Sequence, residues 1–292
     1  MLQLKAIINK KILQSGFLLV VSLSLSSSEP IAYLNTLGYE PAQKEMAYGN
    51  NGMVTTQHFL ATSVGEKILN NGGNAYDASI AIAFTLAVVL PRAGNIGGGG
   101  FMVIYDKDTE RPYSIDYREK APEKSHKDMY LKSDGSFNEK KLSTFGYLSS
   151  GVPGTVAGLW EVHNKFGSLP WEQLLEDAIF YAENGFYITP YMGDVLFKYN
   201  EKMSFFPETK KIFQSNFPDF KNKKFIQKDL AETLKIISSK GRDGFYEGEI
   251  AEKIADDMKL NGGLISISDL KNYRPVWREP LISTYRDNQI IT

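Results

Sequence analysis

The chain has 292 residues, of which 42% are hydrophobic, so it can bury a substantial core and is neither disordered nor fibrous in composition. Its 33 basic residues nearly cancel its 34 acidic residues, which excludes a strong overall field for nucleic acid or an anionic membrane. The absence of cysteine excludes disulfides, thiolate nucleophiles and cysteine metal sites, and it leaves the redox compartment undecided.

The N-terminus has the order of a secretory signal peptide. Three lysines within the first 11 residues precede the apolar stretch 17–25, and the small residues 26–28 follow it. The alternative is a membrane anchor, but the apolar stretch is far shorter than the ~20 residues that a spanning helix needs. We therefore expect a signal peptide at 1–28, one exported region at 29–292, a periplasmic or extracellular location and no stable membrane span.

Hydrophobic periodicity predicts two helices at the start of the exported region. Apolar residues at helical spacing predict a helix from Leu60 to Asn71, where the following glycines favour a left-handed cap. Asn74 can cap a second helix over residues 75–90, which is apolar on almost every side and ends at Pro91. Such a helix is expected to be buried on most of its faces.

A run of four glycines, 97–100, separates this helix from two predicted strands. The apolar run 101–105 predicts a core strand, and the alternation over 113–118 predicts a strand on which Arg118 and Asp116 share one face. A nucleotide-binding loop needs its glycines after a strand and before a helix, the reverse of this order. We therefore interpret the glycines as positions of close backbone packing.

The rest of the chain is predicted to be mainly helical, and it ends in a hairpin. Four helices that each stop at glycine are predicted, at 156–166, 171–183, 229–240 and 250–260. The segment 205–224 is predicted to be irregular, and a strand at 281–285 is followed by a turn and a returning strand at 289–292. Because so short a hairpin is marginal without further strands, we expect the chain to be a fragment of a longer protein.

Few side chains have spacing that indicates chemistry. The three histidines, His58, His126 and His163, lie far apart without ligand spacing, so we expect surface or capping roles and no metal. The G-x-S-x-G motif of serine nucleophiles is absent, and no pattern in the sequence indicates a cofactor. The planar guanidinium of Arg118 can donate two parallel hydrogen bonds to a carboxylate. The residue pattern alone favours an internal ion pair with Asp116 or Glu119 over binding of a ligand carboxylate.

A series of segments between about residue 46 and the end of the chain resembles the gamma-glutamyltransferase family, also called glutathione hydrolases. In order, these segments are Gly72–Ala78, Pro91–Met102, Asp116–Pro122, Ser150–Gly158, Asp243–Gly248 and Asn261–Ile265, followed by Asp269-Leu270 and Tyr273. Their occurrence together and in family order is specific, whereas a single glycine run is not.

The resemblance implies an α+β fold, the N-terminal-nucleophile hydrolase αββα sandwich, which is incomplete without the small subunit that self-cleavage produces. It implies attack by an N-terminal threonine on the gamma-glutamyl amide of glutathione or related compounds, with transfer to water or to an amino-acid or peptide acceptor. It assigns to Arg118 the alpha-carboxylate of the gamma-glutamyl group. The threonine and the other family contacts fall beyond Thr292, which is itself not the nucleophile, so these residues alone are expected to be inactive.

Three alternatives stay open at this point. A related beta-lactam acylase or a poly-gamma-glutamate transferase would keep the fold and change the substrate. A non-catalytic extracytoplasmic binding protein would use the same region to bind glutamate. A role for Arg118 in binding a free alpha-carboxylate weakens the acylase alternative.

Overall fold

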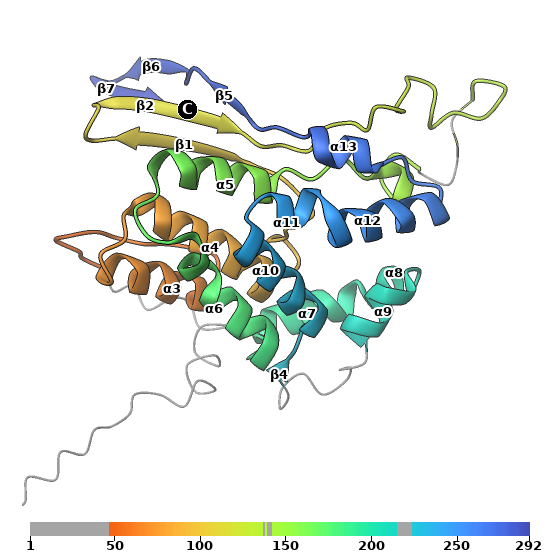
Figure 1. Cartoon of the computed structure of the whole chain (residues 1–292), viewed down its shortest axis with the longest axis horizontal. Helices are drawn as coiled ribbons and strands as arrows, with labels where there is room; N and C mark the ends of the chain where they lie inside the picture. Colours follow the sequence, from red (N-terminus) through yellow and green to blue (C-terminus); the bar gives the residue numbers. More distant parts are fainter. Residues whose placement is uncertain (1–46, 137, 139–141, 215–223) are drawn as a thin grey trace, which may run out of the picture.

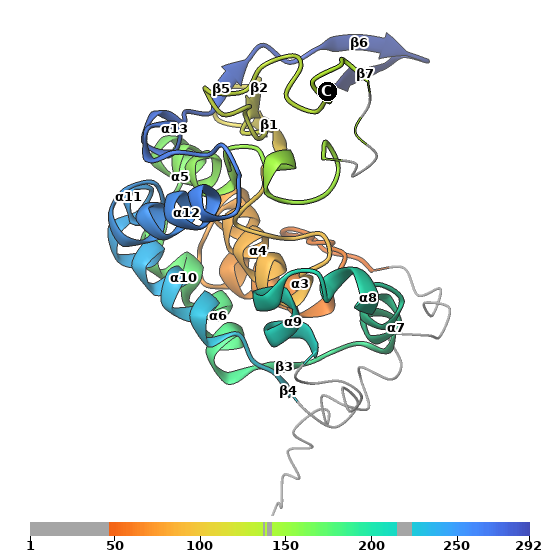
Figure 2. The same ribbon diagram turned by 90° about the vertical axis from the view of Figure 1, so that its right-hand side faces the viewer.

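The computed structural model describes residues 47–136, 138, 142–214 and 224–292. It has an α+β fold in which a layer of helices supports one face of a three-stranded sheet (Figures 1 and 2). The predicted signal peptide, residues 1–28, lies outside the described residues. Within the described part, no helix is both long enough and apolar enough to cross a membrane.

The predicted helices and strands are present, most of them with boundaries within a few residues of those expected. The helices are α3 (Phe59–Asn70), α4 (Ala75–Val89), α5 (Thr155–Phe166), α6 (Trp171–Asn184), α7 (Pro190–Lys198), α8 (Asn200–Met203), α9 (Pro207–Gln214), α10 (Lys228–Lys240), α11 (Asp243–Tyr246), α12 (Gly248–Leu260) and α13 (Ile267–Asn272), with a 3-10 turn at Tyr147–Ser149. The strands are β1 (Phe101–Asp106), β2 (Arg111–Asp116), β3 (Phe186–Tyr187), β4 (Lys224–Phe225), β5 (Val276–Arg278), β6 (Ile282–Tyr285) and β7 (Asn288–Ile291).

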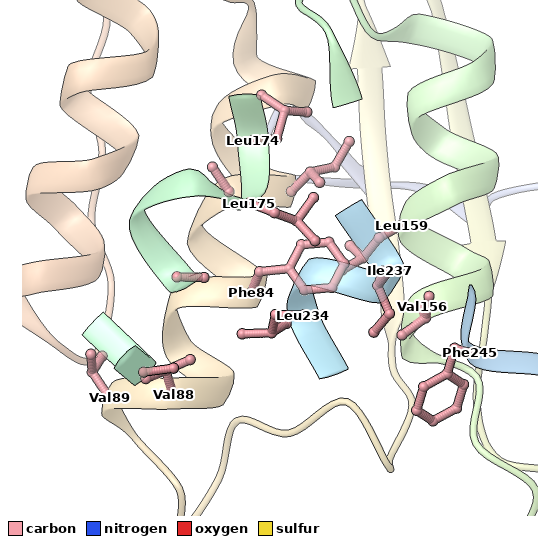
Figure 3. Packing of buried hydrophobic residues seen from close by; sticks show 14 of the residues in the cluster. Phe84, Val88, Val89, Val156, Leu159, Leu174, Leu175, Leu234, Ile237 and Phe245 are labelled. Carbon is pink, nitrogen blue, oxygen red and sulfur yellow. The ribbon is translucent and has the colours of Figure 1, made fainter. Parts of the chain in front are cut away.

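Helix α4 is the centre of the helical layer, as its apolar sequence predicts. It packs against α3, α5 and α6, and residues on most of its faces are buried. Its Phe84 is fully buried and meets the Trp171 ring edge-on, with 5.5 Å between the ring centroids. Figure 3 shows Phe84 among side chains from α6 and α10, including Leu175 and Leu234. Burial of large side chains of this kind is the main source of stability in such a layer.

The start of α4 is fixed by a buried carboxylate. Asn74 and Asp77 form a capping box, in which the backbone N–H of Asn74 donates to Asp77 at 3.0 Å. Asp77 also accepts from the backbone N–H of Ser168 at 3.1 Å and from the Ser168 hydroxyl. These bonds tie the loop after α5 to the start of α4, and they satisfy a charge that would otherwise be costly to bury.

The main sheet has the order β1-β2-β5, and both strand pairs are antiparallel. The register places Met102 opposite Ile115 and Ile115 opposite Trp277, so these side chains share one face. The sheet lies over α5 (Figure 1). On this face the Trp277 indole N–H donates to Glu161 of α5 at 3.2 Å. The opposite face is uncovered in the described structure, where three apolar side chains of β1 are substantially exposed. They are Phe101 (58%), Val103 (47%) and Tyr105 (55%).

Strands β6 and β7 form the predicted hairpin. Arg286 and Asp287 connect them with φ angles of 49° and 65°, the left-handed pair that matches a two-residue turn to strand twist.

The prediction that 205–224 is irregular is wrong in part, because α9 occupies Pro207–Gln214. Pro207 favours the start of that helix, and Phe213 stacks on Phe225 with 5.4 Å between ring centroids. Residues 215–223 lie outside the described structure.

The buried His58 at the start of α3 makes stability depend on pH. Its Nδ1 accepts the backbone N–H of Leu60 at 3.3 Å, and burial lowers its pKa from 6.5 to about 4. Because the pKa is lower in the folded state, the unfolded state binds more protons between these two values. The free energy of unfolding should therefore fall as pH drops from 6.5 to 4, by up to ~1.4 kcal/mol per unit.

Urea unfolding of the full-length protein at a series of pH values measures this dependence. His58→Asn keeps a capping acceptor and removes the titrating ring, so the slope over this pH window should become shallower. His126→Asn is the matched control, because His126 is exposed. An equal slope in wild type and His58→Asn would contradict the assignment.

Candidate functional site

Arg118 lies just beyond the end of β2. The strand ends at Asp116, and one further pair of backbone hydrogen bonds joins Tyr117 to Gly100 at 2.9 and 3.3 Å. The chain then leaves the sheet, and Lys120 pairs with Val152 instead. The Arg118 side chain is 68% exposed. The prediction that the strand extends over 113–118 and includes Arg118 is therefore wrong, because the strand stops two residues earlier.

Both backbone polar groups of Arg118 are hydrogen-bonded, the N–H to a side chain two residues earlier and the carbonyl to a residue far along the chain. Its N–H donates to Asp116 Oδ1 at 2.9 Å, and its carbonyl accepts the Tyr273 hydroxyl at 2.8 Å. Arg278 donates to Asp116 Oδ2 from Nε at 2.9 Å and from Nη2 at 2.7 Å. Burial alone would raise the pKa of Asp116, but the bonds from Arg118 and Arg278 hold it below its ordinary value. The carboxylate thus stays charged and keeps the main chain in place.

The glycine run packs closely against this segment. The Gly98 carbonyl accepts the backbone N–H groups of Gly154 and Thr155 at 2.7 and 3.0 Å, which joins the run to the start of α5. A Cβ on Gly99 would overlap the carbonyl oxygen of Tyr117, and so would a Cβ on Gly154. The interpretation of the run as close backbone packing is confirmed for Gly99, which lies against the backbone that carries Arg118. A Cβ on Gly98 or Gly100 would meet side chains, and one on Gly97 would have no neighbouring atom closer than 3.9 Å.

The Arg118 guanidinium has one weak partner. Its Nε lies 3.3 Å from Glu119 Oε2, so the internal ion pair is with Glu119 and not with Asp116. Elsewhere in the described structure, its two terminal nitrogens contact no acceptor. An exposed pair of this kind contributes about 0–1 kcal/mol, so it does not prevent the guanidinium from binding another anion. The two terminal nitrogens can donate in parallel to both oxygens of one carboxylate.

The histidines do not form a site. His58 caps α3 and His126 is exposed, and both were predicted to be capping or surface residues. His163 is instead half-buried, with Nε2 2.9 Å from the carbonyl oxygen of Leu169. No group of three or more histidine, aspartate or glutamate side chains in the described part of the chain could hold a metal ion.

Segments that are far apart in the sequence meet around Arg118. The Tyr246 hydroxyl donates to the Pro153 carbonyl at 2.8 Å, and its ring stacks on Tyr273 with 5.8 Å between centroids. Sequence reasoning missed the roles of Tyr273 and Arg278 as partners of the Arg118 segment. Tyr273 was part of a recognised motif, but its partner was not apparent, and Arg278 carried no signal.

The chain is similar to known proteins in both sequence and structure. The family model described as gamma-glutamyltranspeptidase matches residues 61–292. The glutathione hydrolase proenzyme of Pseudomonas aeruginosa is 43% identical over 244 residues, which is 83% of this chain and 42% of that protein. The glutathione hydrolase proenzyme of Escherichia coli is 40% identical over 263 residues, covering 89% of this chain and 44% of that protein.

A solved structure agrees with these matches. The gamma-glutamyltranspeptidase of Helicobacter pylori superposes with a TM-score of 0.80 at 43% identity, covering 85% of this chain and 71% of that one. The chain spans less than half the length of the curated relatives that it matches. The family match includes the glycine run, the Arg118 segment and Tyr273. The chain therefore belongs to the gamma-glutamyltranspeptidase family.

Proposed function

We propose that the full-length protein is a gamma-glutamyltransferase and glutathione hydrolase, and that these residues form part of its larger subunit. The precursor cleaves itself before a threonine outside the 292 residues, and that threonine becomes the nucleophile. Its hydroxyl attacks the gamma-glutamyl carbonyl, forming an acyl-enzyme and releasing the amine. Water or the amino group of an amino acid or peptide then takes the acyl group and restores the threonine.

The observation that carries this proposal is the arrangement of Arg118. Its backbone is fixed on both sides, while its terminal nitrogens are free of other contacts in the described structure. A substrate alpha-carboxylate can therefore displace a weak pair with Glu119 and gain two charge-assisted hydrogen bonds. Because the arginine starts from a fixed backbone, the contact also orients the distant gamma-amide for attack.

The uncovered sheet face supports the expected partner. Phe101, Val103 and Tyr105 present adjacent apolar side chains on the outer face of β1, and large exposed patches of this kind mark contact surfaces. We assign this face to the small subunit produced by self-cleavage, whose sheet would complete the two-sheet sandwich. The signal-peptide pattern at 1–28 supports export to the periplasm or the exterior.

The alternative substrates differ in the group that Arg118 would bind. A beta-lactam acylase acts on a side chain that need not carry a free alpha-carboxylate, so the Arg118 arrangement favours gamma-glutamyl compounds over it. A poly-gamma-glutamate transferase would use the same carboxylate, and only the length of the preferred substrate separates it from a glutathione hydrolase. A glutamate-binding protein would need no nucleophile.

Expression of the complete gene with its native leader tests the proposal. We expect cleavage into two subunits, recovery outside the cytoplasm, and release of glutamate from glutathione, with faster turnover when glycylglycine is present as acceptor. Hydrolysis of a beta-lactam side-chain amide without hydrolysis of glutathione would favour the acylase. Preference for long poly-gamma-glutamate over glutathione would favour the polymer transferase. Glutamate binding by an uncleaved, inactive protein would favour the binding role.

A further inference from the structure

The carbonyl of Arg118 accepts a hydrogen bond from a buried tyrosine. Tyr273 is only 2% exposed, and its hydroxyl donates to the Arg118 carbonyl at 2.8 Å across 155 residues of sequence. Burial, followed by the charges of Asp116 and Glu119, raises the pKa of Tyr273 above its ordinary value. The hydroxyl therefore remains a proton donor throughout the physiological pH range.

The ring of Tyr273 is itself positioned by two residues at α11. It stacks on the ring of Tyr246 at an interplanar angle of 11°, and the Arg242 guanidinium lies over the Tyr246 ring, 4.7 Å from its centroid. Arg242 Nη2 also donates to the Tyr273 carbonyl at 3.1 Å. The contacts with Tyr246 and Arg242 therefore fix the position of Tyr273 and the direction of its hydroxyl.

Arg278, five residues after Tyr273, helps to hold the backbone N–H of Arg118. Arg278 binds Asp116, and Asp116 accepts the Arg118 N–H. The Tyr273 contact differs from this one because it acts directly on Arg118, through a single hydroxyl. It can therefore be removed by deleting one oxygen atom while the ring and its packing are kept.

We propose that Tyr273 is a positioning residue for substrate binding, which sets the direction of the Arg118 side chain by holding the Arg118 carbonyl. Tyr273 does not touch the substrate. By restricting Arg118 before the substrate arrives, it lowers the conformational entropy that the arginine loses when it binds a carboxylate. The proposal rests on the function proposed above for Arg118, and it adds a residue that acts only through that arginine.

The test uses Tyr273→Phe in the full-length, self-cleaved enzyme. Loss of one positioning hydrogen bond should lower kcat/KM for glutathione about three- to ten-fold, mainly through a higher KM, with self-cleavage retained. Tyr76→Phe is the matched control, because it also deletes one tyrosine hydroxyl, which donates to Asp106 at 3.2 Å and makes no bond to Arg118 or Tyr273. That variant should lose stability while KM stays within about two-fold of wild type.

A double-mutant cycle with Arg118→Ala separates positioning from a general structural effect. If Tyr273 acts through Arg118, Tyr273→Phe should have little further effect on kcat/KM once the arginine is absent. An unchanged KM in Tyr273→Phe, or an equal loss in both backgrounds, would overturn the positioning role while leaving that of Arg118 intact. If Arg118→Ala itself leaves KM unchanged, the proposed function of Arg118 fails first, and the role of Tyr273 fails with it.

Discussion

Arg118→Lys in the full-length enzyme should raise the KM for glutathione about ten- to hundred-fold, while the precursor still cleaves itself. Lysine keeps the positive charge but loses the planar pair of donors that binds both oxygens of a carboxylate. Loss of one or two charge-assisted hydrogen bonds is worth about 1.5–3 kcal/mol, which corresponds to this change in KM. Steady-state assays of glutamate release measure KM, and gel analysis of the subunits measures self-cleavage.

Lys107→Ala is a suitable control for a general loss of surface charge. Lys107 belongs to an exposed pair with Glu110, separated by 3.6 Å. Its removal should leave KM unchanged, because exposed pairs of this kind contribute little and Lys107 is not next to Arg118. If Arg118→Lys has the wild-type KM, the role assigned to Arg118 is wrong.

Gly154→Ala should destabilise the protein by about 3 kcal/mol or more and should also weaken glutathione binding. The backbone angles of Gly154, φ −120° and ψ −18°, do not require glycine, so the expected loss comes from steric overlap. The added Cβ would overlap the Tyr117 carbonyl oxygen and the Tyr273 hydroxyl, and the first of these is backbone that cannot rotate away. The segment that carries Arg118 would have to move.

Gly193→Ala provides the matched comparison. Gly193 lies within α7, and a Cβ built there has no neighbouring atom within 4 Å. Alanine should leave stability unchanged or raise it by up to ~1 kcal/mol, because it restricts the unfolded chain and favours helix. Urea unfolding of both variants measures the difference. Equal stability of Gly154→Ala and Gly193→Ala would contradict the packing argument.

The helical layer could be predicted from the sequence because its signals are local. The apolar run of α4, its Asn74 cap and the glycine stops after the later helices each depend on residues within one or two turns. The hairpin of β6 and β7 was predicted for the same reason. Helix α9 was missed because its lysines and proline are typical of loops, and its stabilising contact with Phe225 is not visible in sequence.

The site was predictable only in part. Arg118 could be identified by its motif, but the strand end at Asp116 could not, because it depends on Lys120 turning away to pair with Val152. The partnership of Arg118 with Tyr273 spans 155 residues, and nothing in the periodicity of either segment indicates it. Long-range hydrogen bonds of this kind follow from the packing of α13 against α11 and α12, so they appear only once the fold is known.

The most direct test of the central claim compares two substrates on two enzymes. Wild-type enzyme and Arg118→Ala are assayed for kcat/KM on an L-gamma-glutamyl anilide and on the 4-aminobutyryl anilide, which lacks only the alpha-carboxylate. If Arg118 binds that carboxylate, the wild type should prefer the gamma-glutamyl substrate about 100-fold or more, and Arg118→Ala should lose most of this preference. The same preference in both enzymes would contradict the role of Arg118 and the account of the site built on it.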